Sequence, residues 1–227
     1  MKVSTLVFIC IAVLVLLGGA FAYYITFVVP QESKKTTTTA GEVRTRRIVA
    51  FGDSLTYGYN LPITDSYPNQ LQEKLNTLGY NYKVINVGVN GDTTANGLAR
   101  VEEAFSFEPD LVLLEFGAND FLRSQSPELA QQNLDKIIKA FDDKNVKVIL
   151  LNIEQNPLLP LQNRERFQQI MPDLGKKYGV PVVPSFLDGI LLNTELTLED
   201  RLHPNKAGYK KAVDENLWPV LVKQLVK

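Results

Sequence analysis

The stretch Ile48-Val49-Ala50-Phe51-Gly52-Asp53-Ser54 decides the fold expected for this chain of 227 residues. Its four apolar residues form a short run that ends at a glycine, a pattern that predicts a β-strand. The polar residues Asp53 and Ser54 then follow the strand in a turn. In open α/β sheets, ligands bind outside the carboxyl ends of the strands. This stretch therefore predicts a sheet and a site at the edge of that sheet.

Beyond this strand, helix-like and strand-like segments alternate. Leu71, Leu75 and Leu78 recur at helical spacing before Gly79. Another amphipathic segment begins at Pro127, after an expected N-cap at Ser126. We predict strands at residues 48–51, 82–89, 110–116, 146–153 and 180–184, and helices at residues 66–78, 93–105, 127–143, 163–178 and 205–226.

Strands separated by helices predict a parallel sheet, because the crossovers are right-handed and cover both faces of the sheet with helices. Five such strands predict an α/β fold, namely a flavodoxin-like three-layer α/β/α sandwich with a five-stranded parallel sheet. The strand expected at residues 110–116 is almost continuously apolar, and Glu115 interrupts it near its end. We expect the whole domain to occupy residues 47–227.

Distinctive polar residues follow the expected strands, as the rule for ligand sites requires. They are Gly52-Asp53-Ser54 after the first strand, Gly91-Asp92-Thr93 after the second, Gly117-Ala118-Asn119-Asp120 after the third, and Asp200 with His203 after the fifth. Since the carboxyl ends of parallel strands share one edge of the sheet, we expect these four segments to converge there.

His203 is the only histidine of the chain, and it comes three residues after Asp200. A serine hydroxyl needs an adjacent base to act as a nucleophile, and histidine is the usual base because its unperturbed pKa is about 6.5. One turn of chain can bring the Asp200 carboxylate to one ring nitrogen and leave the other for Ser54. Two alternatives stay open: Asp188 is a rival orienting acid, and Gly-Asp-Ser alone is a common helix cap.

Gly91 and Asn119 are candidates for stabilising a developing oxyanion. A glycine before a helix allows its backbone N–H to face an anion. The side-chain NH₂ of Asn119 can donate to the same oxygen. Each residue also has an ordinary interpretation, since glycine and asparagine are common in turns and at helix caps.

Taken together, these motifs resemble those of the SGNH or GDSL hydrolases, and the resemblance covers residue 47 to the C-terminus. Within that family the chain is most similar to the bacterial thioesterase I, lysophospholipase L1 and arylesterase group. The motifs that carry the resemblance are Phe51-Gly52-Asp53-Ser54-Leu55-Thr56, Gly91-Asp92-Thr93-Thr94 followed by Gly97-Leu98-Ala99-Arg100, Phe116-Gly117-Ala118-Asn119-Asp120, and Asp200-Arg201-Leu202-His203-Pro204-Asn205.

The resemblance implies a serine esterase or thioesterase that acts on acyl esters without a metal or cofactor. It makes Ser54 the nucleophile, His203 the general base and Asp200 its orienting acid. It also implies an oxyanion hole formed by the Ser54 N–H, the Gly91 N–H and the Asn119 side chain. Two other functions stay open: a carbohydrate or cell-wall acetylesterase, and a non-catalytic membrane-tethered binding domain.

The N-terminus predicts a membrane segment, because residues 3–29 contain no charged side chain. As a helix this run would span roughly 40 Å, which exceeds a bilayer core. We expect an anchor at residues 1–30 and a polar tether at residues 31–46. The alternative is a cleaved signal segment, because Ala20-Phe21-Ala22 resembles a cleavage site. We expect the domain on the extracytoplasmic side, although the cationic residues that follow the run favour the cytoplasm.

Composition excludes several other classes of function. The formal net charge of −1 gives no electrostatic reason to expect a nucleic-acid partner. Cys10 is the only cysteine, so the chain cannot form an internal disulfide or use Cys/His zinc spacing. We therefore expect no metal. The resemblance to the SGNH hydrolases implies a small acyl ester as the partner of the domain.

Overall fold

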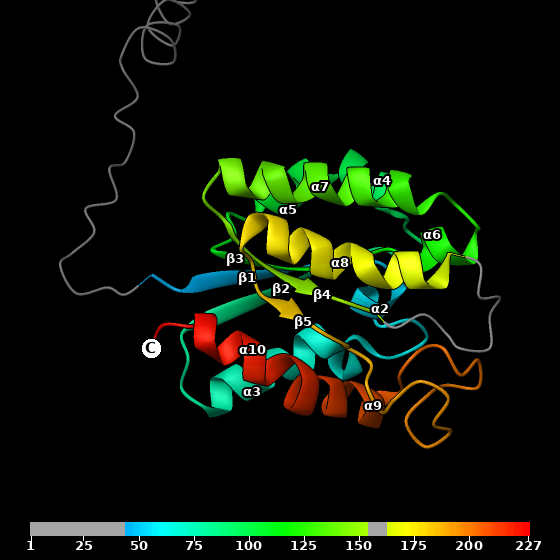
Figure 1. Cartoon of the computed structure of the whole chain (residues 1–227). Coiled ribbons are helices and arrows are strands. Elements are labelled where there is room, and N and C mark those ends of the chain that lie inside the picture. Colours follow the sequence, from blue (N-terminus) through cyan, green and yellow to red (C-terminus); the bar gives the residue numbers. More distant parts are fainter. Residues whose placement is uncertain (1–43, 154–162) are drawn as a thin grey trace, which may run out of the picture. The chain divides into compact units, whose positions relative to one another are not determined.

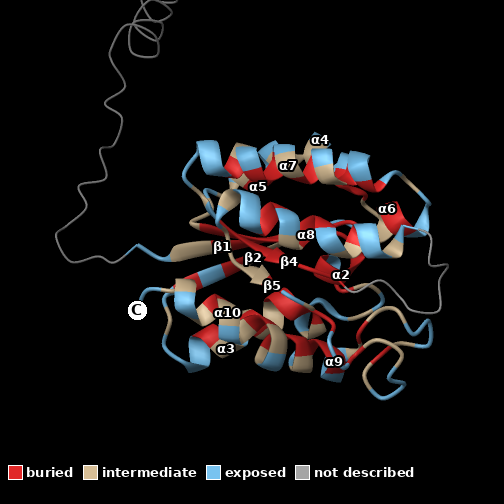
Figure 2. Cartoon of the chain, in the orientation of Figure 1, coloured by how far each residue is buried: buried red, intermediate tan, exposed pale blue. Residues whose placement is uncertain are grey.

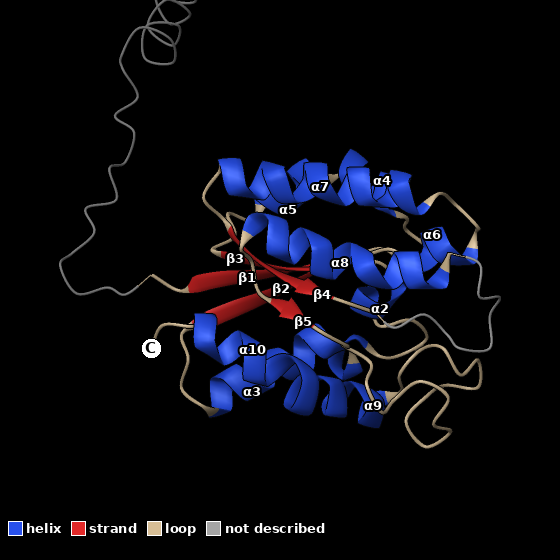
Figure 3. Ribbon diagram, in the orientation of Figure 1, coloured by secondary structure: helices blue, strands red, loops and turns tan. Residues whose placement is uncertain are grey.

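The strands of the computed structural model form one parallel sheet in the order β2-β1-β3-β4-β5 (Figure 3). The structure describes residues 44–153 and 163–227. The bounds are β1 Arg46–Gly52, β2 Tyr82–Gly88, β3 Leu111–Glu115, β4 Lys147–Leu151 and β5 Val182–Val183. All neighbouring strands pair in parallel, so the predicted five-stranded parallel sheet is confirmed.

Helices cover both faces of the sheet and make the three layers visible in Figure 1. One layer contains α4 (Thr94–Ala99), α5 (Val101–Ser106), α7 (Pro127–Asp143) and α8 (Arg164–Tyr178). The other contains α3 (Tyr67–Thr77), α9 (Lys206–Lys211) and α10 (Trp218–Leu221). Ser126 caps α7 by accepting a hydrogen bond from the Leu129 N–H, as predicted.

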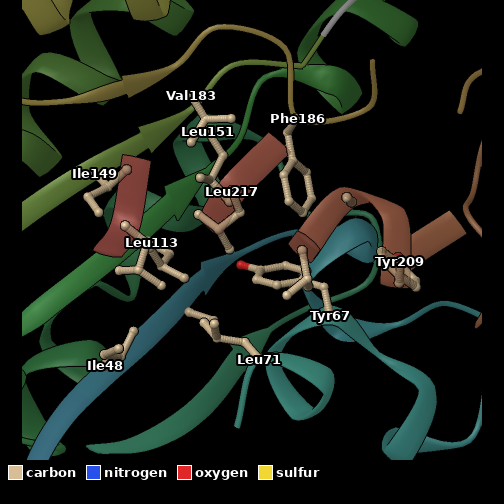
Figure 4. Close-up of a cluster of buried hydrophobic side chains, with 14 of the residues drawn as sticks. Ile48, Tyr67, Leu71, Leu113, Ile149, Leu151, Val183, Phe186, Tyr209 and Leu217 are labelled. Carbon is tan, nitrogen blue, oxygen red and sulfur yellow. The ribbon is translucent and has the colours of Figure 1, made fainter. Parts of the chain in front are cut away.

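Side chains of β1 supply both halves of the core, because successive residues of a strand point to opposite faces. Ile48 and Ala50 belong to a cluster with Tyr67, Leu71 and Tyr209, part of which Figure 4 shows. Val49 and Phe51 face a second cluster, which packs against α7 and α8. Figure 2 shows buried residues along the sheet and on the helix faces turned toward it. Because β1 is packed on both faces, the position of the turn that follows it at Gly52 is fixed by the core.

The single helix predicted at residues 93–105 is wrong, because the segment breaks at Arg100 into α4 and α5. Gly97 lies in α4, and a β-carbon there would meet the Phe116 ring at 2.7 Å. Arg100 leaves helical geometry, and its guanidinium donates hydrogen bonds to the carbonyl oxygens of Gly52 and Val87. These long-range bonds end the helix at that point.

The closing helix predicted at residues 205–226 is also interrupted. Asn205 caps α9, a π-helical segment η3 (Ala212–Leu217) follows, and after α10 the chain ends in the 3₁₀ turn η4 (Val222–Gln224). Pro219 has no N–H and cannot continue the regular bonding pattern, which gives a reason for the change just before it.

Several short helical elements lie where the sequence predicted loops. They are α2 (Ser54–Tyr57), the 3₁₀ turn η2 (Ile63–Asp65) and α6 (Ala118–Leu122). The predicted fifth strand is longer than the observed Val182–Val183, because only these residues pair with β4.

The expected membrane anchor, the tether up to residue 43 and the segment 154–162 lie outside the described residues. Across the two described ranges, every helix is too short or too polar to cross a bilayer.

Candidate active site

Ser54 stands at the first position of α2, directly beyond the end of β1. Asp53 caps this helix, and its Oδ1 accepts a hydrogen bond from the Leu55 N–H at 3.0 Å. The turn needs Gly52, because a β-carbon there would lie 2.1 Å from Thr56 Oγ1 and 2.6 Å from the Glu115 carbonyl oxygen. The helix-cap interpretation therefore applies to Asp53 and leaves the Ser54 hydroxyl available at the edge of the sheet.

The structure brings Ser54, His203 and Asp200 into one line of contacts. Ser54 Oγ lies 2.9 Å from His203 Nε2, and His203 Nδ1 lies 2.7 Å from Asp200 Oδ2. Asp200, and not the alternative Asp188, is therefore the carboxylate that contacts the His203 ring. The other Asp200 oxygen, Oδ1, accepts hydrogen bonds from the Leu202 and His203 N–H groups.

The environment of Asp200 favours its ionised form. Partial burial raises its pKa, but hydrogen bonds from the backbone N–H groups of His203 and Leu202 and from the imidazole outweigh burial. The pKa of Asp200 therefore lies below its usual value. A carboxylate in this state is suited to accept a hydrogen bond from Nδ1–H and to fix the imidazole tautomer.

Two neighbouring segments hold His203 in place. Its carbonyl oxygen accepts a hydrogen bond from the Leu198 N–H at 2.8 Å, next to a bridge between Thr197 and Pro204. On one side of the imidazole lies the Tyr59 ring, with 4.5 Å between ring centroids and 38° between ring planes. Sequence reasoning missed Tyr59, although it lies five residues after Ser54.

Asn119 joins the loops that follow β1, β2 and β3. Its Nδ2 donates hydrogen bonds to Asp53 Oδ2 and to the Asp92 carbonyl oxygen, both at 3.0 Å. Gly91, beside Asp92, has φ +82°, a conformation that favours glycine. The Gly91 carbonyl oxygen accepts a hydrogen bond from Arg123 at 2.7 Å. The predicted candidates Gly91 and Asn119 thus belong to one hydrogen-bonded group of loops.

Arg100 is a further residue of this edge for which sequence reasoning assigned no role. Its Nε lies 2.6 Å from Asp92 Oδ2, and its Nη2 donates to the Gly52 carbonyl oxygen at 2.9 Å. The guanidinium also lies over the Phe51 ring, 4.6 Å from the centroid. Arg100 therefore ties the loop after β2 to the end of β1.

Two carboxyl groups lie fully buried behind Ser54, on Asp53 and Glu115. Burial raises the pKa of Asp53 to about 6, against hydrogen bonds from the Leu55 N–H and the Asn119 amide that favour the charged form. Burial, and then the charge of Asp53, raise the pKa of Glu115 well above its usual value. The only signal for this pair in the sequence is Glu115 itself, a carboxylate in an apolar strand.

A cavity of about 310 Å³ opens beside the serine. Among its lining residues are the polar side chains of Ser54, Asn119 and His203. The leucine and isoleucine side chains that line it are Leu55, Leu122, Ile153, Leu187, Leu191 and Leu202. The sequence also predicts that the loops at residues 55–65 and 155–161 shape the acyl pocket, with Leu158, Leu159 and Leu161 as candidate lining residues. Leu55 and Tyr59 of the first loop line the cavity, whereas the second loop lies outside the described residues. No group of three or more His, Cys, Asp or Glu side chains that could hold a metal ion occurs in the described ranges.

Comparison with known proteins agrees with this geometry. Residues 50–211 match the model of the GDSL-like lipase/acylhydrolase family. An arylesterase of Vibrio mimicus is 36% identical over 187 residues, which cover 82% of this chain and 93% of the relative. The thioesterase 1/protease 1/lysophospholipase L1 of Escherichia coli K12 is 31% identical and aligns over 70% of this chain and 76% of its own length.

Among solved structures, the crystal structure of TesA superposes with a TM-score of 0.76 at 32% identity, covering 79% of this chain and all of that one. The chain belongs to the GDSL-like lipase/acylhydrolase family, the SGNH hydrolases. It is a carboxylic ester hydrolase of the esterase and thioesterase type.

Proposed function

We propose that this enzyme hydrolyses acyl esters or thioesters through a covalent acyl-enzyme on Ser54. The observation that carries the proposal is the line from Ser54 Oγ to His203 Nε2 and from Nδ1 to Asp200 Oδ2. The first distance is within reach for proton transfer from the nucleophile to its base, and the second is within reach for the hydrogen bond by which the acid orients that base. The apolar cavity beside Ser54 supplies room for the acyl chain.

In the first half of the reaction, Ser54 Oγ attacks the acyl carbonyl carbon while His203 Nε2 takes the hydroxyl proton. The leaving alcohol or thiol then receives that proton from His203, and the acyl group stays on Ser54. In the second half, a water molecule loses a proton to His203 and attacks the acyl carbonyl carbon. The bond to Ser54 Oγ then breaks, Oγ takes the proton back from His203, and the acid is released. Asp200 stabilises the imidazolium in both halves and does not take up the proton.

The N–H groups of Ser54 and Gly91 and the Asn119 side chain would stabilise the tetrahedral oxyanion. Both N–H bonds of the Asn119 amide are engaged, one by Asp53 and one by Asp92. A substrate oxyanion would therefore have to draw one of these bonds toward itself. The bond to the neutral Asp92 carbonyl oxygen is the weaker of the two, because hydrogen bonds to ionised acceptors are stronger.

The lining of the cavity favours substrates with an acyl chain longer than acetyl, because several leucine and isoleucine side chains form part of its wall and offer apolar contacts. The family relatives named above act, by their names, on aryl esters, thioesters or lysophospholipids. A carbohydrate or cell-wall acetylesterase remains the alternative. Such an enzyme would place its larger, polar substrate group outside this cavity.

A fluorophosphonate probe and a substrate panel test the proposal. The probe should label the enzyme, and Ser54→Ala should lose both labelling and hydrolysis of p-nitrophenyl esters. Ser106→Ala, at a surface serine that donates to the Glu103 carbonyl oxygen, is the matched control. Undiminished hydrolysis by Ser54→Ala would refute the proposed acyl-enzyme mechanism. The panel compares p-nitrophenyl esters of increasing chain length, acyl-CoA, lysophospholipid and acetylated sugars, and a preference for acetylated sugars would favour the alternative.

We also propose that residues 1–30 anchor the enzyme and that the domain lies on the extracytoplasmic side. The uncharged run at residues 3–29 supports an anchor. Protease added to intact cells should digest an exposed domain, whereas complete protection would reverse the orientation. A mature N-terminus beyond residue 22 would indicate signal cleavage instead.

A further inference from the structure

Glu115 lies directly beneath the turn that carries Ser54. It is the last residue of β3, and it pairs in register with Gly52, the last residue of β1. Its side chain is fully buried. A buried carboxyl group needs a reason, because removing it from water is costly unless hydrogen bonds or a cation compensate.

One oxygen of Glu115 holds the turn on both sides of the serine. Glu115 Oε2 accepts a hydrogen bond from the Asp53 N–H at 3.2 Å and another from Thr56 Oγ1 at 3.0 Å. Asp53 precedes Ser54, and Thr56 follows it in α2. The same carboxyl oxygen therefore fixes the backbone entering the serine and the first turn leaving it. The other oxygen, Oε1, is buried and has no hydrogen-bond partner within the described part of the chain.

The Asp53 carboxylate connects this turn to the oxyanion side of the site. Asp53 Oδ1 accepts from the Leu55 N–H, and Oδ2 accepts from Asn119 Nδ2. Ser54 Oγ lies 3.5 Å from the same Oδ1. Asp53 is thus surrounded by donors that favour a negative charge, whereas Glu115 leaves one oxygen unpaired.

The surroundings of Glu115 favour a neutral acid. The titratable groups that act on it from the elements packed around it are Asp53 after β1, Tyr67 of α3 and Tyr209 of α9. His203 also acts electrostatically on Asp53. The Asp53 charge acts directly on Glu115, and two ionised carboxylates buried together would repel each other strongly. Burial and the Asp53 charge both raise the pKa of Glu115. This direction agrees with a pair of carboxyl groups that carries a single negative charge, on Asp53.

We propose that Glu115 is a positioning residue of the reaction, which as a neutral acid holds the Asp53–Thr56 turn and leaves Asp53 as the only charge beneath Ser54. This inference rests on the proposed function of Ser54. It predicts that an uncharged side chain of the same shape can replace Glu115. It also predicts that ionising Glu115 weakens the fold and misplaces the serine.

The consequence for stability has a definite sign. The folded protein binds the Glu115 proton more tightly than the unfolded chain, whose glutamate pKa is about 4.3. Above that pH the unfolded chain releases the proton first, so the free energy of unfolding falls with rising pH until the folded group also ionises. A glutamine at this position cannot ionise, so the Glu115→Gln variant should lack this fall in the free energy of unfolding.

The experiment compares full-length wild type, Glu115→Gln, Glu115→Ala and the surface control Glu165→Gln. We expect Glu115→Gln to keep kcat near that of wild type at neutral pH. Glu115→Ala should lower kcat by about 10- to 100-fold with a smaller change in KM, the loss expected from a displacement of the serine by up to 1 Å. Denaturant unfolding should show the stability of Glu115→Gln rising relative to wild type as the pH increases above about 4.3, the pKa of a glutamate in the unfolded chain. The control should run parallel to wild type.

Two results would overturn the inference. One is a Glu115→Gln variant as impaired in kcat as Glu115→Ala. The other is a stability difference between Glu115→Gln and wild type that does not change with pH, which remains measurable even if Glu115→Ala fails to fold. Labelling of Ser54 by the fluorophosphonate separates these outcomes from a failure of the proposed function, because that failure would abolish labelling of the wild type itself.

Discussion

Ser54 Oγ lies 2.9 Å from His203 Nε2, although 149 positions of the sequence separate the two residues. The two residues meet because β1 delivers Ser54 to the carboxyl edge of the sheet, and the Leu198–Pro204 segment holds His203 over that edge. The distance is short enough for proton transfer with no movement of the backbone. The serine, the histidine and Asp200 are thus in contact without a bound substrate.

Replacing Asp200 should separate the orienting role of this residue from that of Asp188. Asp200→Asn removes the charge that favours Nδ1–H of His203, so kcat should fall by up to about 10⁴-fold. Asp188→Asn is the matched control, because the Asp188 side chain is exposed and only its carbonyl oxygen bonds to Asn216. Rates of ester hydrolysis by both variants check this prediction. A loss of activity confined to Asp188→Asn would show that Asp188 is the orienting acid.

The same substitution has a pH signature in stability. The folded pKa of Asp200 lies below the unfolded value, so its contribution is present above about pH 4 and is lost as the pH falls through the folded pKa. Asp200→Asn should therefore destabilise the protein at neutral pH and matter less in acid. Urea unfolding at several pH values measures the difference, and an equal difference at all of them would contradict the prediction.

Asn119→Ala should lower kcat by about 10²- to 10³-fold, the usual loss for one oxyanion donor. The substitution also releases the Asp53 carboxylate and the Asp92 carbonyl oxygen, so a fall in melting temperature should accompany it. Asn76→Ala on the exposed end of α3 is the control. If kcat stays unchanged while the melting temperature falls, Asn119 connects the loops after β1 and β2 but does not stabilise the oxyanion.

Tyr59 should act through its ring and not through its hydroxyl group. Its ring lies against the imidazole of His203 and lines the cavity. Ring contacts of this kind contribute about 0.5–1.5 kcal/mol, so Tyr59→Ala should lower kcat/KM about 2- to 10-fold. Tyr59→Phe should keep the wild-type value. Steady-state kinetics on a p-nitrophenyl ester test the pair, and equal losses in both variants would assign the effect to the hydroxyl.

Gly208→Ala should destabilise the domain and disturb His203. A β-carbon at Gly208 would lie 2.1 Å from the Leu196 carbonyl oxygen and 3.0 Å from Pro204 Cβ. Such overpacking costs about 1–3 kcal/mol in free energy of unfolding. Thermal unfolding measures the loss, with the exposed Lys206→Ala of the same helix as control. A variant as stable and active as wild type would show that the Leu196–Pro204 segment yields without cost.

Much of the sheet could be predicted because the signals are local. The run Ile48–Phe51 is apolar and ends at a glycine, and each later strand contains a short run that is mostly apolar. Helix interruptions could not be predicted, because they depend on contacts made elsewhere in the fold. Arg100 ends α4 by reaching Gly52 and Val87, which lie on two strands. Propensity at Arg100 alone would have continued the helix.

The sequence alone determined which residues could do the chemistry, because one histidine and the polar residues after the strands restrict the choice to a few candidates. Tertiary structure decided which of them meet. It brought Asp200 to His203 Nδ1, it placed Asn119 between Asp53 and Asp92, and it buried Glu115 under the serine turn. The physical reason is that distances and burial arise from packing between distant segments, and no local pattern records them.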